Sequence, residues 1–162
     1  MYITDVIKLP SSNNSVSVNS GLINNKPTFN QPEQPFPDNG STIKYFSEGG
    51  VAPFQVITPS GDLNYFIKVV DWSSKQPIIS IFVHSGQTAD VKLPLGSYEV
   101  KYATGEKWYG EKYLFGPDTS YNKADTRLDF TQSGNRFQGH TIKLIPQTGG
   151  NLRTSKISPS DF

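Results

Sequence analysis

Short runs of alternating apolar and polar residues, separated by turns rich in glycine, proline and serine, fill the chain from Ser41 onward. In DLNYFIKVVDW (62–72), every second side chain from Leu63 to Val69 is apolar, and the other face is partly apolar as well. A period of two is that of a β-strand, and two partly apolar faces predict a central strand that is covered on both sides. The connection WSSKQP leads to PIISIFVH (77–84), so the two segments predict a hairpin.

Further segments of the same kind predict the remaining strands. They are TIKYFSE (42–48), FQVITP (54–59), QTADVKLP (87–94), LGSYEVKYATG (95–105), KADTRLDFTQ (123–132), RFQGHTIKLIPQ (136–147) and NLRTSKI (151–157). Because no segment has a sustained helical period, the chain is predicted to form an all-β domain, an antiparallel β-sandwich in preference to a closed barrel. In residues 95–105 we expect Tyr98, Val100 and Tyr102 to face inward, and Glu99 and Lys101 to face outward.

Residues 1–40 have a different composition, rich in Ser, Asn, Pro and Gln. Such a stretch buries too little apolar surface to offset its ordering entropy, and its prolines favour an extended conformation. We therefore place a boundary near residue 40, between this arm and a domain over residues 41–162. The arm is interpreted either as a linker or as a segment that wraps a neighbouring subunit. The anchors of a wrapping arm would be Tyr2, Ile3, Val6, Ile7, Leu9, Phe29 and Phe36.

The segment EKWYGEKYLFGPDTSY (106–121) concentrates aromatic residues among Glu, Lys and Gly. If it is a strand, neither face is cleanly apolar, and Gly110 in its middle indicates a bulge or a close backbone approach. One interpretation places Trp108, Tyr113 and Phe115 in the core. The other is a contact surface for a protein or a carbohydrate. Its binding residues would be Trp108, Tyr109, Glu111, Tyr113, Phe115 and Asp118.

Signatures of catalysis are weak in this sequence. Paired carboxylates could serve glycoside hydrolysis, but no spacing selects two that must face each other. The nearest candidates in sequence are Glu99, Glu106, Glu111 and Asp118. The histidines are His84, expected to be exposed at a strand end, and His140, expected to be partly buried; without cysteine or a serine elbow, neither indicates a catalytic triad. We expect no catalytic residues and no enzyme activity.

Metal and cofactor motifs are equally weak. Asp118, Asn122 and Asp125 in DTSYNKAD (118–125) are hard oxygen ligands, but their spacing matches no EF-hand, and an aspartate-capped turn explains them as well. The sequence contains no HExxH, P-loop or dinucleotide fingerprint. We therefore predict neither a metal site nor a cofactor.

Charge and hydropathy limit the partners. The formal net charge is +1 and the basic residues are scattered, which argues against nucleic acid. The start MYITDVIKLPSSNN does not resemble a signal peptide, and no apolar run approaches the ~20 residues of a membrane span. We expect a chain that is soluble and not inserted in a membrane, with a cell-envelope, surface or virion location favoured over the cytoplasm.

Two resemblances add to this interpretation. LPLGSYEVKYATG (93–105) is similar to the turn, glycine and tyrosine that open a strand in transthyretin-like and carboxypeptidase-regulatory-like sandwich domains. Residues 52–162 resemble an uncharacterised bacterial domain. The stretches that carry this second resemblance are YFIKVVD, PLGSYEVKYATG, WYGEKYLFGPDT and GNLRTSKI. The resemblances imply an immunoglobulin- or transthyretin-like sandwich and a bacterial origin, but no activity. From the composition of the arm and of the aromatic segment we expect an assembly in a bacterial envelope or a phage-like particle.

The sequence therefore predicts a non-enzymatic interaction module. It would assemble with a protein partner or with further copies of itself, through the arm and the aromatic segment. A carbohydrate-binding module is the alternative, with Trp108, Tyr109 and Tyr113 as a stacking platform, and a glycosidase-like hydrolase is a third candidate.

Overall fold

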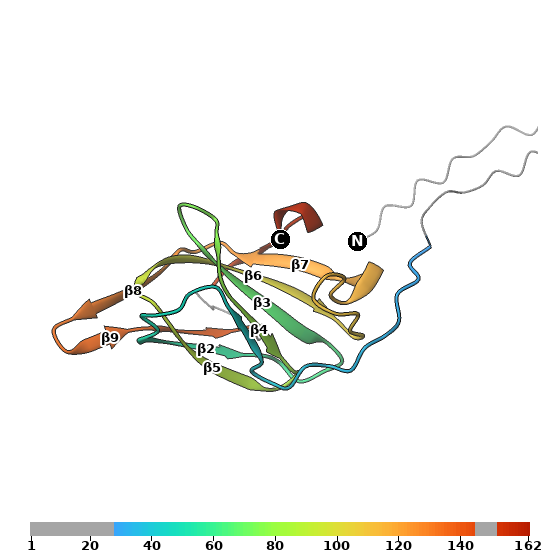
Figure 1. The fold of residues 1–162 in the computed structure, drawn as a ribbon, viewed down its shortest axis with the longest axis horizontal. Helices are drawn as coiled ribbons and strands as arrows, with labels where there is room; N and C mark the ends of the chain where they lie inside the picture. The colour runs from blue at the N-terminus through green and yellow to red at the C-terminus, as the bar shows by residue number, and fades with distance from the viewer. Residues whose placement is uncertain (1–27, 145–151) are drawn as a thin grey trace, which may run out of the picture.

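The computed structural model describes residues 28–144 and 152–162, and within these ranges it contains strands and two short 3-10 turns but no α-helix (Figure 1). The 3-10 turns are η1 (Gly116–Asp118) and η2 (Pro159–Asp161). The strands are β1 (Thr42–Lys44), β2 (Ala52–Ile57), β3 (Asn64–Asp71), β4 (Pro77–Val83), β5 (Thr88–Leu93), β6 (Gly96–Gly105), β7 (Ser120–Ala124), β8 (Leu128–Ser133), β9 (Arg136–Gln138), β10 (His140–Lys143) and β11 (Thr154–Lys156). The prediction of an all-β domain is confirmed.

The strands form two sheets. The larger has eight strands along the path β1-β4-β3-β6-β7-β11, with β8 paired to β6 and β9 paired to β8. The smaller has the order β10-β2-β5. The predicted hairpin is confirmed, because β3 and β4 pair antiparallel, with a bulge between Val69 and Val70. In Figure 1 the β8–β9 hairpin projects from one end of the domain.

The first hydrophobic core contains residues of both sheets, which pack against each other. Phe54 and Val56 of β2 come from the small sheet, and Tyr65, Ile67 and Val69 of β3 come from the large one. Tyr65, Ile67 and Val69 are alternate positions that the pattern of residues 62–72 predicts on one face, whereas Leu63, predicted on the same face, is 42% exposed. At about 25 cal/mol per Å² of buried apolar surface, such a core provides most of the stabilisation of a domain.

Tyr98 closes one end of this core. Its side chain is 3% exposed, and its hydroxyl donates a hydrogen bond of 2.8 Å to the carbonyl of Pro94. A Cβ on Gly96 would lie 3.0 Å from that hydroxyl, so the residue between the turn and the tyrosine has to be small. The turn, glycine and tyrosine picked out in the sequence therefore form one local unit, in which the ring folds back over the turn.

The structure corrects four details of the prediction. One strand pair is parallel, β10 with β2, so the sheets are not purely antiparallel. The segment predicted as one strand over 123–132 is two strands, because the chain leaves β7 at Ala124 and turns before β8 begins at Leu128. The segment predicted as one strand over 136–147 is also two strands, β9 in the large sheet and β10 in the small one. Glu99 does face away from the first core, but it is 7% exposed because lysine side chains cover it.

The large sheet has a second covered face, which we call the outer face. Phe66, Phe82 and Ala103 on this face are buried in a second core. Loop residues after β6 complete this core, and Phe162 packs at its margin. Residues 28–40 run along the outside of the domain toward β1 (Figure 1). The second apolar face predicted for residues 62–72 is therefore covered, by the loop after β6 and by Phe162. The strand pattern alone could not show which residues cover it.

Candidate functional site

Residues 106–119, here called the aromatic loop, are not a strand. Trp108 forms an isolated bridge with Gln34, and the chain then turns through residues 111–115 into η1. The backbone N–H of Leu114 donates to the carbonyl of Gly110 over 2.7 Å, and the N–H of Tyr109 donates to the carbonyl of Leu114, also over 2.7 Å. These bonds close the segment into a compact turn, so the alternation expected of a strand does not apply.

Unusual backbone angles hold this turn. Gly110 and Gly116 have φ of 89° and 74°, and a Cβ on Gly116 would lie 2.8 Å from the ring of Tyr109. Leu114 has φ of 50° although it is not glycine, a conformation that costs about 1–2 kcal/mol. Burial of its side chain at 6% exposure and the two backbone bonds offset this cost. The aromatic loop therefore has one defined backbone conformation.

The inner side of the aromatic loop belongs to the second core. Trp108 and Phe115 are 3% and 2% exposed, and their rings lie 5.1 Å and 6.2 Å from the ring of Phe82. The expectation that these two residues form part of a binding surface is therefore corrected, because burial leaves neither ring available to a partner. A sugar-stacking platform that includes Trp108 is excluded for the same reason.

The outer side of the loop carries Tyr109 and Tyr113, both partly exposed. The ring of Phe29 stands edge-on to both, with centroids 4.9 Å from Tyr109 and 5.9 Å from Tyr113. The ammonium of Lys112 lies 5.1 Å from the centroid of Tyr113. Tyr113 was also a candidate for the core, and its partial exposure distinguishes it from Trp108. Phe29, Tyr109 and Tyr113 together are called the aromatic surface below.

Residues 28–40 lie against the same chain's domain. The N–H of Gln34 donates to the carbonyl of Trp108 over 2.7 Å, and Phe36 packs on Phe82 at 5.9 Å between centroids. His84 was expected to be exposed, but it is partly buried because the chain at Phe36 and Pro37 covers it. Its Nε2 lies 2.7 Å from the carbonyl oxygen of Pro37. Of the predicted arm anchors, Phe29 and Phe36 therefore contact their own domain. The others, Tyr2, Ile3, Val6, Ile7 and Leu9, lie outside the described residues.

The acidic candidates of this region do not converge. Glu111 and Asp118 are exposed, Glu111 in the turn of the aromatic loop and Asp118 in η1. Glu106 is exposed at the start of the loop, whereas Glu99 pairs with lysines on the outer face. Asn122 lies on β7 and Asp125 just beyond it, where the Ser155 hydroxyl donates to its carboxylate. Across the described part of the chain, no three His, Cys, Asp or Glu side chains gather as a metal site requires.

An open hollow of about 660 Å³ lies between β1 and β5, two edge strands of the sheets. Its lining includes Phe46, the acidic residues Glu48 and Asp90, and the basic residues Lys44 and Lys92. None of these residues was a sequence candidate, because the loop and the strand that bring them together are far apart in the chain. The mixed charges give the hollow no dominant sign.

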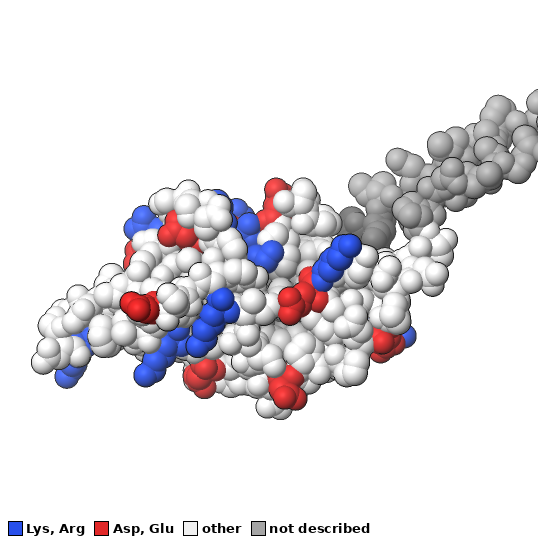
Figure 2. Space-filling view, in the orientation of Figure 1, with Lys and Arg blue, Asp and Glu red and all other residues white. Residues whose placement is uncertain are grey.

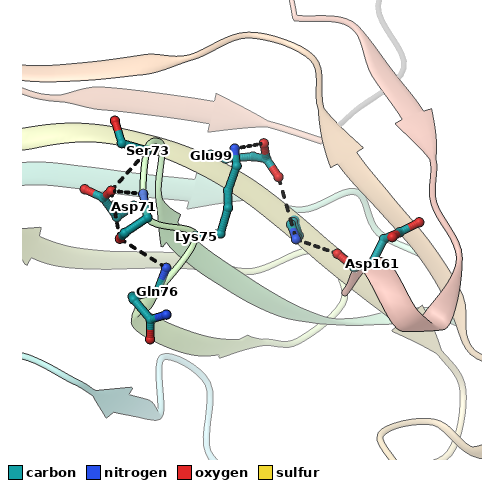
Figure 3. A network of polar contacts seen from close by, with 8 residues as sticks. Asp71, Ser73, Lys75, Gln76, Glu99 and Asp161 are labelled. Atoms are coloured by element: carbon teal, nitrogen blue, oxygen red, sulfur yellow. Dashed lines mark hydrogen bonds and ion pairs between the residues drawn. The ribbon is translucent and has the colours of Figure 1, made fainter.

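The sequence also missed a polar network on the outer face (Figure 3). Lys75 donates to Glu99 over 2.9 Å, and the Lys101 ammonium lies 3.7 Å from the other oxygen of Glu99. Burial favours the neutral form of Glu99, but the bond from Lys75 and the charges of Lys75, Lys101 and Lys123 outweigh it and lower the pKa of this carboxyl. The alternation in residues 95–105 predicted that Glu99 and Lys101 face away from the core. It could not show that Lys75 from the turn after β3 would meet Glu99.

The turn between β3 and β4 adjoins this network. Asp71 Oδ1 accepts hydrogen bonds from the N–H groups of Ser73 and Ser74, over 3.0 Å and 2.7 Å (Figure 3). These bonds, led by the one from the Ser74 backbone, lower the pKa of Asp71. The turn therefore presents Lys75 to Glu99 in a fixed position.

Charge on the visible face of the molecule is mixed. Figure 2 shows basic and acidic groups scattered among neutral ones, without a continuous field of one sign.

Comparison with known proteins finds no match: no family model, no curated protein and no solved structure is similar enough to count as one. Within residues 28–144 and 152–162, no helix has the length and apolar character needed to cross a bilayer.

Proposed function

We propose that the chain is a non-enzymatic interaction module, a β-sandwich of immunoglobulin- or transthyretin-like type that assembles with partner subunits. Contact would be made by the N-terminal arm and by the aromatic surface, in an assembly such as a bacterial envelope structure or a phage-like particle. Two sheets around a shared core support the sandwich, and a partly exposed aromatic group on a fixed loop supports the contact role.

The observation that carries the proposal is the position of Phe29 on Tyr109 and Tyr113. This contact holds Phe29 on the aromatic loop, so the chain that precedes it, which includes residues 1–27, is covalently joined next to Tyr109 and Tyr113. A stretch of this length can extend for roughly 90 Å. A partner docked on the aromatic surface would therefore also meet the arm, and the two contacts would reinforce each other through their high effective concentration.

The aromatic surface has the chemistry of a protein contact. Tyrosine combines a large apolar ring with a hydroxyl and loses little conformational entropy when it is immobilised. Because the Tyr109 ring packs against Phe29 and lies beside Gly116, it is held in place before a partner arrives. Preorganisation of this kind lowers the entropic cost of association.

The proposal is tested on self-assembly, by sedimentation velocity of the full chain over a range of concentrations. Deletion of residues 2–9 and the substitution Tyr113→Ala are each expected to weaken association about tenfold or more, the effect of losing an interface anchor. Phe137→Ala is the matched control, since Phe137 is 42% exposed on β9. Association that neither change affects would contradict the proposal, and a chain that stays monomeric throughout would contradict assembly between copies of it.

Carbohydrate binding is the second candidate. The observation in its favour is the partial exposure of Tyr109 and Tyr113, whose faces could stack on a sugar ring. Glycan-array binding that disappears in Tyr113→Ala while the circular dichroism spectrum is kept would support it. Equal binding by Tyr113→Ala would remove the aromatic surface as its site.

A further inference from the structure

Asn39 and Gly40 form the turn through which residues 28–40 enter β1. The N–H of Ser41 donates to the carbonyl of Asp38 over 3.0 Å, and Gly40 has φ of 81°. A bond of this kind with a positive φ at the third residue is typical of a type II turn, which selects glycine there. Asn39-Gly40 is also the one Asn-Gly pair in the sequence. Because glycine has no Cβ, its backbone nitrogen is less hindered than that of any other residue that could follow the asparagine.

An asparagine in this setting is open to spontaneous deamidation, since its side chain is chemically labile. The backbone nitrogen of Gly40 attacks Cγ of Asn39, and a cyclic imide forms as ammonia leaves with the proton of that nitrogen. Water then opens the imide at either carbonyl and gives aspartate or isoaspartate. The reaction needs no reagent besides water. Asn39 is exposed, and a Cβ on Gly40 would meet nothing within 4 Å, so water has access to the pair.

The fold engages both reacting groups in hydrogen bonds. The side-chain nitrogen of Asn39 donates to the Thr88 carbonyl over 2.9 Å, and its oxygen accepts from the His84 N–H over 2.9 Å. The N–H of Gly40 donates to the carbonyl of Phe82 over 2.8 Å. The attacking nitrogen is therefore occupied as a donor, and the group that it would attack is fixed to the end of β4 and the start of β5. Both groups have to leave these partners before they react.

Their release requires residues 36–40 to separate from the domain. Phe36 packs on the rings of Phe82 and His84, with centroids 5.9 Å and 6.0 Å away, and the Pro37 carbonyl oxygen lies 2.7 Å from His84 Nε2. These contacts hold the same short stretch that Asn39 fastens. The rate of deamidation in the folded chain is then the rate in the free segment multiplied by the fraction of time that this stretch is open.

Deamidation changes what the side chain can bind. Both products carry a carboxylate oxygen in place of the amide nitrogen, and an ionised carboxylate accepts hydrogen bonds but donates none. The bond to the Thr88 carbonyl is lost, and the two oxygens repel each other. Isoaspartate also lengthens the backbone of the turn by one carbon atom. The link between Asn39 and the start of β5 therefore cannot re-form.

We propose that Asn39 is a modification site whose deamidation loosens residues 36–40 from the domain irreversibly. Opening of this stretch exposes the reactive pair, and the product prevents it from closing as before. The step runs in one direction because the ammonia is lost to solvent. This inference goes beyond the proposed function, since it depends neither on the aromatic surface nor on a partner.

The test follows deamidation of Asn39 in the full chain by tandem mass spectrometry of a proteolytic peptide, at mildly alkaline pH. The same chain unfolded in guanidinium chloride gives the reference rate, and the folded chain should react about tenfold more slowly or less. Phe36→Ala should raise the folded rate several-fold, because it removes packing on Phe82 and His84 and leaves the reacting pair unchanged. Phe137→Ala, which should not change the rate, is the matched control, since Phe137 is 42% exposed and Phe36 is 36% exposed.

Hydrogen exchange tests the consequence and separates local opening from global unfolding. Asn39→Asp carries the aspartate product, and it should speed exchange of the Gly40 N–H several-fold relative to its intrinsic rate, while buried Ile67 of β3 stays protected. Equal reaction rates in the folded and unfolded chains would overturn the proposal. So would a wild-type reaction rate in Phe36→Ala, or wild-type exchange at Gly40 in Asn39→Asp. A faster reaction in Phe36→Ala with equal loss of protection at Ile67 would also overturn it, because the opening would then be global.

Discussion

At the scale of single residues, Glu99 shows how a charge becomes buried at low cost. Its side chain is almost enclosed, yet the lysines beside it keep it ionised by lowering its pKa below the ordinary value of 4.5. A carboxyl whose pKa is lower in the folded state contributes stability that is complete above the unfolded-state pKa. The contribution is lost as the pH falls through the folded-state pKa.

Glu99→Gln should therefore lower the free energy of unfolding at neutral pH by about 1–3 kcal/mol, because Lys75 and Lys101 lose their anionic partner. The difference between the two proteins should shrink as the pH drops below 4.5, because the carboxyl of the unfolded chain is protonated first, and it should vanish once the pH falls through the lower folded-state pKa. Urea unfolding at a series of pH values measures this. A difference that stays constant into the acid range would show that Glu99 acts through packing and not through its charge.

Tyr98 offers a second test at this scale. Tyr98→Phe keeps the ring in the core but removes the hydroxyl that donates to Pro94, so the free energy of unfolding should fall by about 0.5–1.5 kcal/mol. Tyr45→Phe serves as the control, because Tyr45 is 55% exposed. Chemical denaturation of both variants gives the comparison. Equal effects would indicate that the hydrogen bond to Pro94 contributes nothing.

At the scale of elements, the strands were largely predictable from the sequence. The loop that covers the outer face of the large sheet was not. The alternation around Ile67 and Val69 identified β3 and its buried face, because period two depends only on the local chain. The aromatic loop defeated the same argument, since Trp108 and Phe115 are buried by a turn without strand periodicity. A positive φ at Leu114 had no sequence signal, because leucine rarely adopts that conformation.

The arm illustrates the same limit. Its composition changes near residue 40, but residues 28–40 are held against the domain by single hydrogen bonds that composition cannot reveal. Asn39 is the clearest case: its amide nitrogen donates to the Thr88 carbonyl over 2.9 Å, and its oxygen accepts from the His84 N–H over 2.9 Å. One side chain thus ties the arm to the ends of two strands.

Asn39→Ala should accordingly lower the free energy of unfolding by about 1–3 kcal/mol, the sum of two ordinary hydrogen bonds. It should also speed amide exchange at His84, whose N–H loses its acceptor. Asn30→Ala, at an exposed arm position, is the matched control and should change neither quantity. If both variants have wild-type stability, residues 28–40 are not part of the folded unit.

At the scale of the whole molecule, the domain presents two contact elements with different chemistry. The aromatic surface joins Phe29 to the aromatic loop, and Lys68 and Lys101 on the outer face hold residues 161–162. Both are anchored on the large sheet or on its second core, so a rigid scaffold positions them.

Hydrogen exchange over residues 1–40, in the dilute chain and in the assembled state, tests the contact role most directly. In the dilute chain the N–H of Gln34 should be protected by its bond to Trp108. Assembly should then slow exchange across residues 2–9 by about tenfold or more, as the arm gains backbone partners on another subunit. Rapid exchange of residues 2–9 in both states would show that the arm is only a tether, and it would contradict assembly through the arm.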